Sequence, residues 1–92
     1  MVVEGVRRVN LIYAGHAREQ MDARRVTEAE VELTVRQPED QYPSREGRTV
    51  AEKSFPSRTG GRPYTVRVVY IVEEENAVII TVVRMTRKRR RR

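Results

Sequence analysis

His16 and the arginines that follow it are the residues of this chain best suited to chemistry. His16 is the only histidine, and Arg18, Arg24 and Arg25 come shortly after it. An imidazole exchanges protons near neutral pH, and guanidinium groups bind phosphate through paired donors. A lone histidine beside several arginines is therefore a candidate general acid–base group in a phosphate-binding environment. The sequence therefore predicts that His16 transfers protons and that Arg18 binds phosphate.

Packing at a helix start, with a hydrogen bond to the backbone, is the alternative role of His16. The positive end of the helix dipole there favours the neutral imidazole. Arg24 and Arg25 end the same predicted helix, where cations complement its negative end. A structural role is therefore sufficient for at least one of these two arginines.

Arg67 and Tyr70 are the other candidates for the reaction site. Arg67 lies between Val66 and Val68 in an apolar strand, and a charge in that position must be paired, exposed at a groove or facing a phosphate. We predict that Arg67 is an electrostatic clamp on phosphate. Tyr70 has a hydroxyl for the same site, although a core role with its hydroxyl at an edge is the alternative.

Further basic residues are predicted to bind nucleic acid. Lys53 either binds phosphate or protects an edge strand, and Arg62 lies next to the flexible Gly60-Gly61 pair. The predicted nucleic-acid-binding set is Arg18, Arg24, Lys53, Arg62, Arg87, Lys88 and Arg89.

The net charge of +6 is concentrated at the C-terminus. Seven of the 19 basic residues lie within 84–92, so that residues 1–83 hold 12 basic and 13 acidic residues. Such a like-charge run binds polyanions without sequence preference or simply keeps the chain soluble. We predict a single domain over residues 1–85 and a basic tail over 86–92.

Composition argues against several classes of protein. The chain has no cysteine and one histidine, which argues against disulfides and a zinc site. No apolar run is long enough to span a bilayer, and the start of the chain has no apolar signal-peptide segment. We expect a cytoplasmic protein without metal or other cofactor, not associated with membranes.

Two helices are predicted early in the chain. Residues 16–23 have apolar positions one turn apart, after Gly15 interrupts a first strand at 6–13. Thr27 and Glu30 have the spacing of a capping box at the start of the second helix, and Pro38 ends that helix.

Strands dominate the remainder. Residues 37–47 are polar and predicted to be a loop, and strands are expected at 48–55, 64–72 and 77–85. The order β-α-α-β-β-β predicts an α+β, two-layer fold in which an antiparallel meander packs on two helices, with the first strand at an edge or beside the last. The last two strands are apolar on both faces, which also favours a homodimer partner.

These motifs resemble a known family. His16-Ala17-Arg18-x-x-Met21, Arg24-Arg25-Val26-Thr27-x-x-x-Val31 and Pro38 resemble a small bacterial domain-of-unknown-function family with the pattern HA-x-x-R-M-x-x-R-x-I-T-x-x-x-V. That family looks like the RelE/ParE and BrnT group of toxins, which have the same element order. The similarity to the better-known toxins lies in this order and not in catalytic residues.

The resemblance implies an endoribonuclease toxin that acts on RNA and is neutralised by an antitoxin protein. RNA cleavage by such a fold needs a base for the 2′-hydroxyl proton, cations for the phosphorane and an acid for the leaving oxygen. Two alternatives remain open. One is a noncatalytic module that binds nucleic acid or protein, as ParE-like proteins do, and the other is a structural homodimer.

Overall fold

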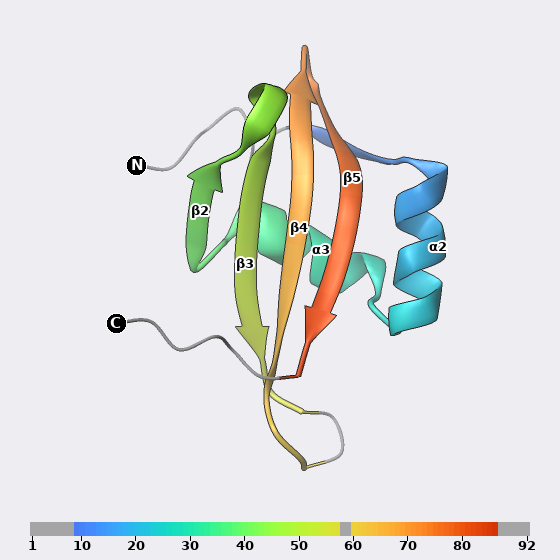
Figure 1. Cartoon of the computed structure of the whole chain (residues 1–92), viewed down its shortest axis with the longest axis vertical. Coiled ribbons are helices and arrows are strands. Elements are labelled where there is room, and N and C mark those ends of the chain that lie inside the picture. The colour runs from blue at the N-terminus through green and yellow to red at the C-terminus, as the bar shows by residue number, and fades with distance from the viewer. Residues whose placement is uncertain (1–8, 58–59, 87–92) are drawn as a thin grey trace.

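A five-stranded sheet and two helices form the α+β fold (Figure 1). The computed structural model describes residues 9–57 and 60–86. Its elements are β1 (Asn10–Tyr13), α2 (Gly15–Arg24), α3 (Glu28–Arg36), β2 (Asp40–Pro43), a 3-10 turn (Arg45–Gly47), β3 (Thr49–Phe55), β4 (Tyr64–Glu73) and β5 (Asn76–Met85). The predicted two-layer α+β class is thereby confirmed.

The strand order in the sheet is β1-β5-β4-β3-β2. The strands β2 to β5 form an antiparallel meander, and β1 runs parallel to β5 at the far edge. This places the first strand both at an edge and beside the last strand, as the sequence predicted. Between β4 and β5 the register shifts at Val69/Tyr70, so that Ile80 is left without an opposite partner.

The prediction of a continuous loop over 37–47 is wrong, because this segment contains β2. Residues Asp40–Pro43 pair with Glu52–Thr49 of β3. Backbone hydrogen bonds form this edge strand, and its mostly exposed side chains carry no alternating apolar pattern that would predict it. Pro43 is tolerated because it ends an edge strand.

The start of α3 follows its sequence signal. The Thr27 hydroxyl accepts a hydrogen bond from the Glu30 amide at 3.1 Å, and the Glu30 carboxylate accepts one from the Thr27 amide at 2.9 Å. This reciprocal capping satisfies two amides that have no partner within the helix. Helix α2 begins and ends one residue outside the predicted range and stops at Arg25, whose φ of 57° is left-handed.

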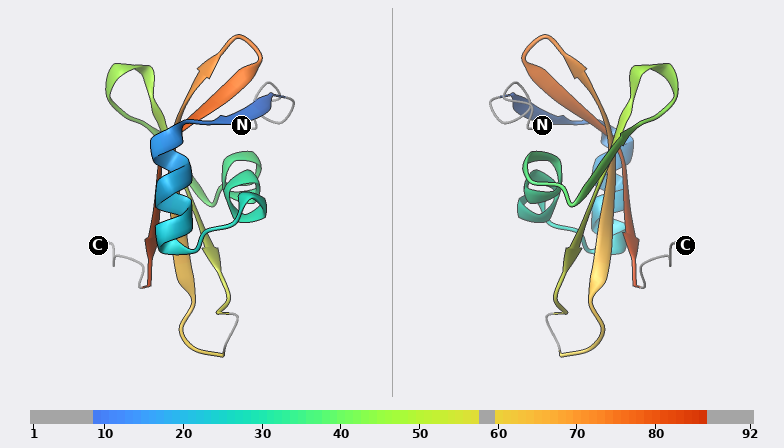
Figure 2. Two further views of the ribbon diagram at one scale, coloured as in Figure 1. Left: turned by 90° about the vertical axis from the view of Figure 1, so that its right-hand side faces the viewer. Right: turned by 90° about the vertical axis from the view of Figure 1, so that its left-hand side faces the viewer.

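The two helices have different relations to the sheet. Helix α3 lies across one face and buries Val31 and Val35 in the core with Val66 and Val68 of β4 (Figure 2). Helix α2 contacts β5 and lies alongside that strand, beyond the point where β1 ends (Figures 1 and 2). No helix in the described part of the chain is long and apolar enough to cross a membrane.

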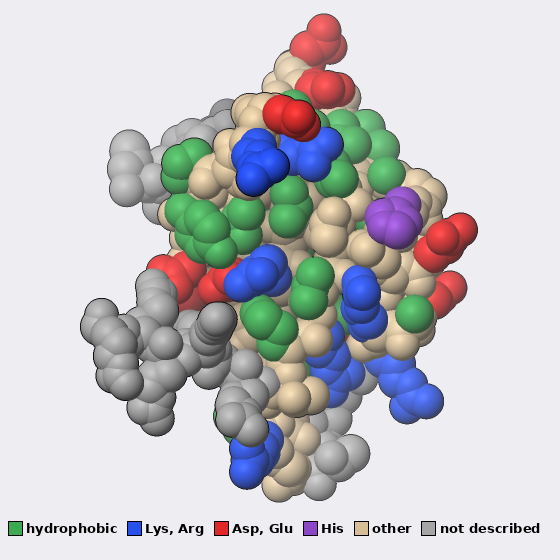
Figure 3. All heavy atoms as spheres, viewed as in Figure 1, with side chains coloured by type: hydrophobic (Ala, Val, Ile, Leu, Met, Phe, Trp, Pro, Cys, Tyr) green, Lys and Arg blue, Asp and Glu red, His purple; other side chains and the backbone are tan. Residues whose placement is uncertain are grey.

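The face of the sheet opposite α3, hereafter the open face, carries side chains that alternate with the core residues along each strand. No helix within the described residues covers it (Figures 1 and 3). Hydrophobic side chains lie on it around a basic group that adjoins acidic ones (Figure 3). Its central residues in register are Tyr42 and Val50, Glu52 and Arg67, and Val69 and Thr81.

Candidate functional site

Arg67 and Glu52 form an ion pair at the centre of the open face. The two residues are opposite each other in the pairing of β3 with β4. Arg67 Nε donates to Glu52 Oε2 at 2.8 Å, and the side chains are 37% and 10% exposed, respectively. A carboxylate this buried requires such a charged partner, so the ion pair accounts for both residues in an apolar sheet.

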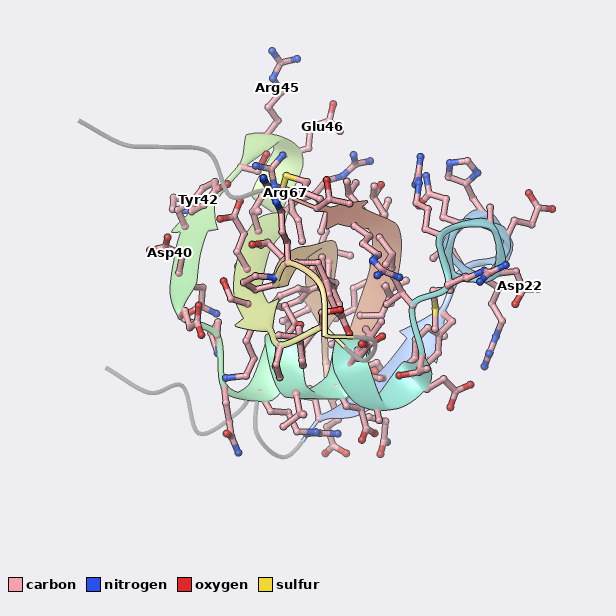
Figure 4. All side chains as sticks on the ribbon, turned by 90° about the horizontal axis from the view of Figure 1, so that it is seen from below. Asp22, Asp40, Tyr42, Arg45, Glu46 and Arg67 are labelled. Atoms are coloured by element: carbon pink, nitrogen blue, oxygen red, sulfur yellow. The ribbon has the colours of Figure 1, made fainter. Side chains whose placement is uncertain are left out.

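Tyr42 of β2 completes the cluster. Its hydroxyl donates to the same Glu52 Oε2 at 3.0 Å. Loss of solvation, the hydrogen bond to Glu52 and the charge of that carboxylate raise the pKa of the Tyr42 hydroxyl, while Arg67 lowers it. The phenol therefore stays protonated at neutral pH. Figure 4 shows Tyr42 and Arg67 on the side of the sheet away from α3.

The orientation of the Arg67 guanidinium suits it to bind an oxyanion. Among the described residues, the guanidinium of Arg67 contacts Glu52 through Nε. This contact holds the planar group, and the Nη1 and Nη2 donors remain for a ligand. The cluster, defined as Tyr42, Glu52 and Arg67, thus offers a carboxylate with a protonated phenol and an anchored cation, each within hydrogen-bond distance of Glu52 Oε2.

His16 belongs to a different cluster. It is exposed at the start of α2, and its Nε2 lies 3.0 Å from Gln20 Nε2. Gln20 Oε1 accepts from the Val82 amide at 2.8 Å, so the NH₂ group of Gln20 faces His16 and the imidazole Nε2 must be the acceptor. Strand β5 lies between α2 and β4, and the structure does not bring His16 and Arg67 together.

Arg18 and Arg24 of α2 both have protein partners. Arg18 forms an exposed ion pair with Glu28 at 2.6 Å and lies over the Tyr13 ring, 4.6 Å from its centre. Arg24 Nη1 donates to the Val82 carbonyl at 2.8 Å. The Gln20 side chain accepts from the Val82 amide, so side chains of α2 bind both backbone polar groups of Val82. These contacts replace the strand pairing at the edge of β5 beyond the point where β1 ends.

Arg18 also lines a pocket of about 440 Å³ at the junction of the two helices. Met21 and Val26 supply its apolar side chains, and charged residues such as Asp22 and Arg25 are part of the lining. This pocket lies apart from the Tyr42, Glu52 and Arg67 cluster.

Tyr70 lies on the opposite face of the sheet from Arg67. It is completely buried against the helices, and its hydroxyl accepts from Gln41 Nε2 at 2.9 Å. Burial raises the pKa of the Tyr70 hydroxyl, whereas the Gln41 hydrogen bond lowers it. The structure therefore does not bring Tyr70 to the phosphate side of Arg67.

The other predicted nucleic-acid-binding residues are dispersed. Lys53 Nζ donates to the Gln37 carbonyl at 3.0 Å. Arg62 is exposed in the connection between β3 and β4. Arg87, Lys88 and Arg89 lie outside the described residues. Among the described residues, no group of three or more metal-ligating side chains is close enough to hold a metal ion.

Sequence reasoning missed two members of the cluster, Glu52 and Tyr42. A signal for Glu52 was available, because an arginine in an apolar strand calls for a carboxylate on a neighbouring strand, and Glu52 is the one acidic residue of the predicted 48–55 strand. Tyr42 had no such signal, since its segment was predicted to be a loop.

Comparison with known proteins gives a family without an assigned activity. Residues 13–84 match the model of a family described as domain of unknown function DUF4258. The match covers most of the chain, from the last residue of β1 through both helices, β2, β3 and β4 to all but the last residue of β5, so the chain belongs to this family. No curated protein and no solved structure matches the chain.

Proposed function

We propose that this DUF4258 protein is a RelE-like, toxin-type endoribonuclease that cleaves RNA by metal-independent acid–base chemistry on its open face. The supporting observation is the joint contact of Arg67 Nε and the Tyr42 hydroxyl with Glu52 Oε2. These three groups match the three needs of RNA cleavage, and the α+β fold is compatible with that of RelE-like toxins. Their location on a face that no helix of the described residues covers favours access by an RNA strand.

In the proposed reaction, Glu52 takes the proton of an RNA 2′-hydroxyl. The O2′–P bond forms while the P–O5′ bond breaks, and the Arg67 Nη donors stabilise the charge on the phosphorane. Tyr42 donates its proton to the departing O5′. The products are a 2′,3′-cyclic phosphate and a 5′-hydroxyl, so all atoms are accounted for.

The hydrogen bond between Tyr42 and Glu52 closes the proton cycle. After cleavage, Glu52 holds the proton from the 2′-hydroxyl and Tyr42 has lost its own. The 3.0 Å contact between the two oxygens lets the proton return to the phenol. No metal, cofactor or external acid is needed for a further turnover.

Binding beyond the cluster is assigned to the basic residues of the chain. Arg87, Lys88 and Arg89 of the tail supply nonspecific attraction to the RNA backbone, in keeping with their charge. A toxin of this kind requires an antitoxin protein, and one that covers the open face would block the Tyr42, Glu52 and Arg67 cluster.

A noncatalytic RNA-binding module is the second candidate, because Tyr42 is exposed and aromatic. An exposed ring stacks on an unpaired base, and the adjacent Arg67 binds a phosphate, without any proton transfer. In that case RNA binds to the open face and stays intact.

Incubation of the full chain with a labelled RNA in excess EDTA tests the proposal. We expect fragments that end in 2′,3′-cyclic phosphate and 5′-hydroxyl, and no cleavage at a position that carries a single 2′-deoxy substitution. Intact RNA with retained binding would establish the noncatalytic module instead.

The same assay decides the role of His16. With Tyr42 and Glu52 moving the protons, His16→Ala is expected to keep cleavage within about threefold of the unmodified protein, since His16 is in a separate cluster. Loss of cleavage in a folded His16→Ala protein would assign proton transfer to His16, as the sequence predicted, and contradict the assignment to Tyr42 and Glu52.

A further inference from the structure

Two consecutive residues of β2 fasten this strand from opposite sides of the sheet. Tyr42 lies on the open face and donates to Glu52, while Gln41 lies on the helix face and donates to Tyr70. Strand β2 has four residues and pairs with β3 along one side. A strand this short at an edge is held by few backbone hydrogen bonds, so its side-chain contacts fix its orientation.

The Gln41 contact reaches across a neighbouring strand. Tyr70 is on β4 and Gln41 on β2, so their 2.9 Å hydrogen bond spans β3. Ala51 of β3 is opposite both Gln41 and Val68 in register, and its side chain is a single methyl group. This small side chain leaves room for the Tyr70 ring to extend toward β2.

We propose that Gln41 and Tyr70 are positioning residues that hold Tyr42 in reach of Glu52. The inference rests on the proposed function for its consequence on cleavage, but its geometry does not. Tyr70 is completely buried and therefore held rigidly, so the hydrogen bond to its hydroxyl restrains the position of β2. Because Gln41 and Tyr42 are adjacent, a rotation of β2 that breaks the first contact also moves the Tyr42 hydroxyl away from Glu52 Oε2.

The Tyr42 hydroxyl itself reports on this positioning. Its pKa is raised in part by the hydrogen bond and the charge of Glu52. In a Tyr70→Phe protein, which keeps the ring and loses the hydroxyl, we expect the titration of the Tyr42 ¹³Cζ signal to move toward lower pH. Tyr13→Phe removes a phenol that lies beside Arg18, and it is expected to leave the Tyr42 titration unchanged.

Cleavage should respond in the same variants. We expect kcat to fall about tenfold in Tyr70→Phe with little change in KM, since the acid is displaced while Arg67 still binds phosphate. Gln41→Ala removes the other partner at an exposed position, so it should fold normally and show the same two effects.

Rescue separates positioning from a general loss of packing. In Gln41→Glu, the new carboxylate can accept from the Tyr70 hydroxyl, so the Tyr42 titration and kcat should both return toward the values of the unmodified protein. An unchanged Tyr42 titration in Tyr70→Phe and Gln41→Ala would overturn the proposal. Absence of RNA cleavage by the unmodified protein would refute the proposed function alone, because the titration still tests the positioning of Tyr42.

Discussion

Glu52→Gln is expected to lower the rate of RNA cleavage by about a hundredfold or more. The substitution keeps the size of the side chain and a carbonyl oxygen that accepts from Arg67 or Tyr42, but an amide cannot take the 2′-hydroxyl proton. General base catalysis of this kind contributes roughly 10²–10⁴ in rate. Single-turnover cleavage of a labelled RNA under saturating protein measures the loss directly.

Glu39→Gln is the matched control for this prediction. Glu39 is also a carboxylate beside β3, where it accepts a hydrogen bond from the Ser54 amide at 3.1 Å. It is exposed and is not part of the Tyr42, Glu52 and Arg67 cluster. We expect its variant to cleave RNA at the unmodified rate, and equal losses in the two variants would show that Glu52 is not the base.

Ile79→Ala is expected to destabilise the protein by about 2–5 kcal/mol, the usual cost of a cavity at a fully buried aliphatic residue. Ile79 is 0% exposed and lies opposite Tyr70, next to the register shift between β4 and β5. The free energy of unfolding of a small domain is only about 5–15 kcal/mol, so this loss would be a large share of the stability. Urea unfolding followed by far-UV circular dichroism measures it.

Ile12→Ala is the matched control, because it makes the same substitution at an exposed position. Ile12 is an isoleucine of β1 with 45% of its surface exposed. Its truncation removes less buried surface and leaves no enclosed cavity, so we expect a change below about 1 kcal/mol. Similar losses in both variants would contradict the position of Ile79 in the core.

Most of the fold could be predicted from local patterns. The capping box at Thr27 and the apolar strands after residue 64 specify their elements through interactions close in sequence. Strand β2 could not be predicted, because three of its four residues are exposed and the segment forms a strand only by pairing with β3. Its polar side chains carry no periodic signal.

The candidate site was predicted only through Arg67. The register that sets Glu52 opposite Arg67 results from tertiary pairing of β3 with β4, which no local pattern specifies. The motif around His16 was conspicuous in sequence, but its side chain binds Gln20, four residues further along the same helix. A rare residue type such as the single histidine is therefore easier to identify from the sequence than residues that only strand pairing brings together.

Mapping where RNA binds on the protein tests most directly whether the reaction centre lies at Tyr42, Glu52 and Arg67. We propose titrating ¹⁵N-labelled protein with a short 2′-O-methyl RNA, which binds and cannot be cleaved, while following the Arg67 Nε–Hε signal and the backbone amides. The expected result is a large shift of Arg67 Nε–Hε together with amides of β2, β3 and β4 around the cluster. Shifts centred on α2 and His16, with Arg67 unchanged, would contradict a reaction centre at Tyr42, Glu52 and Arg67.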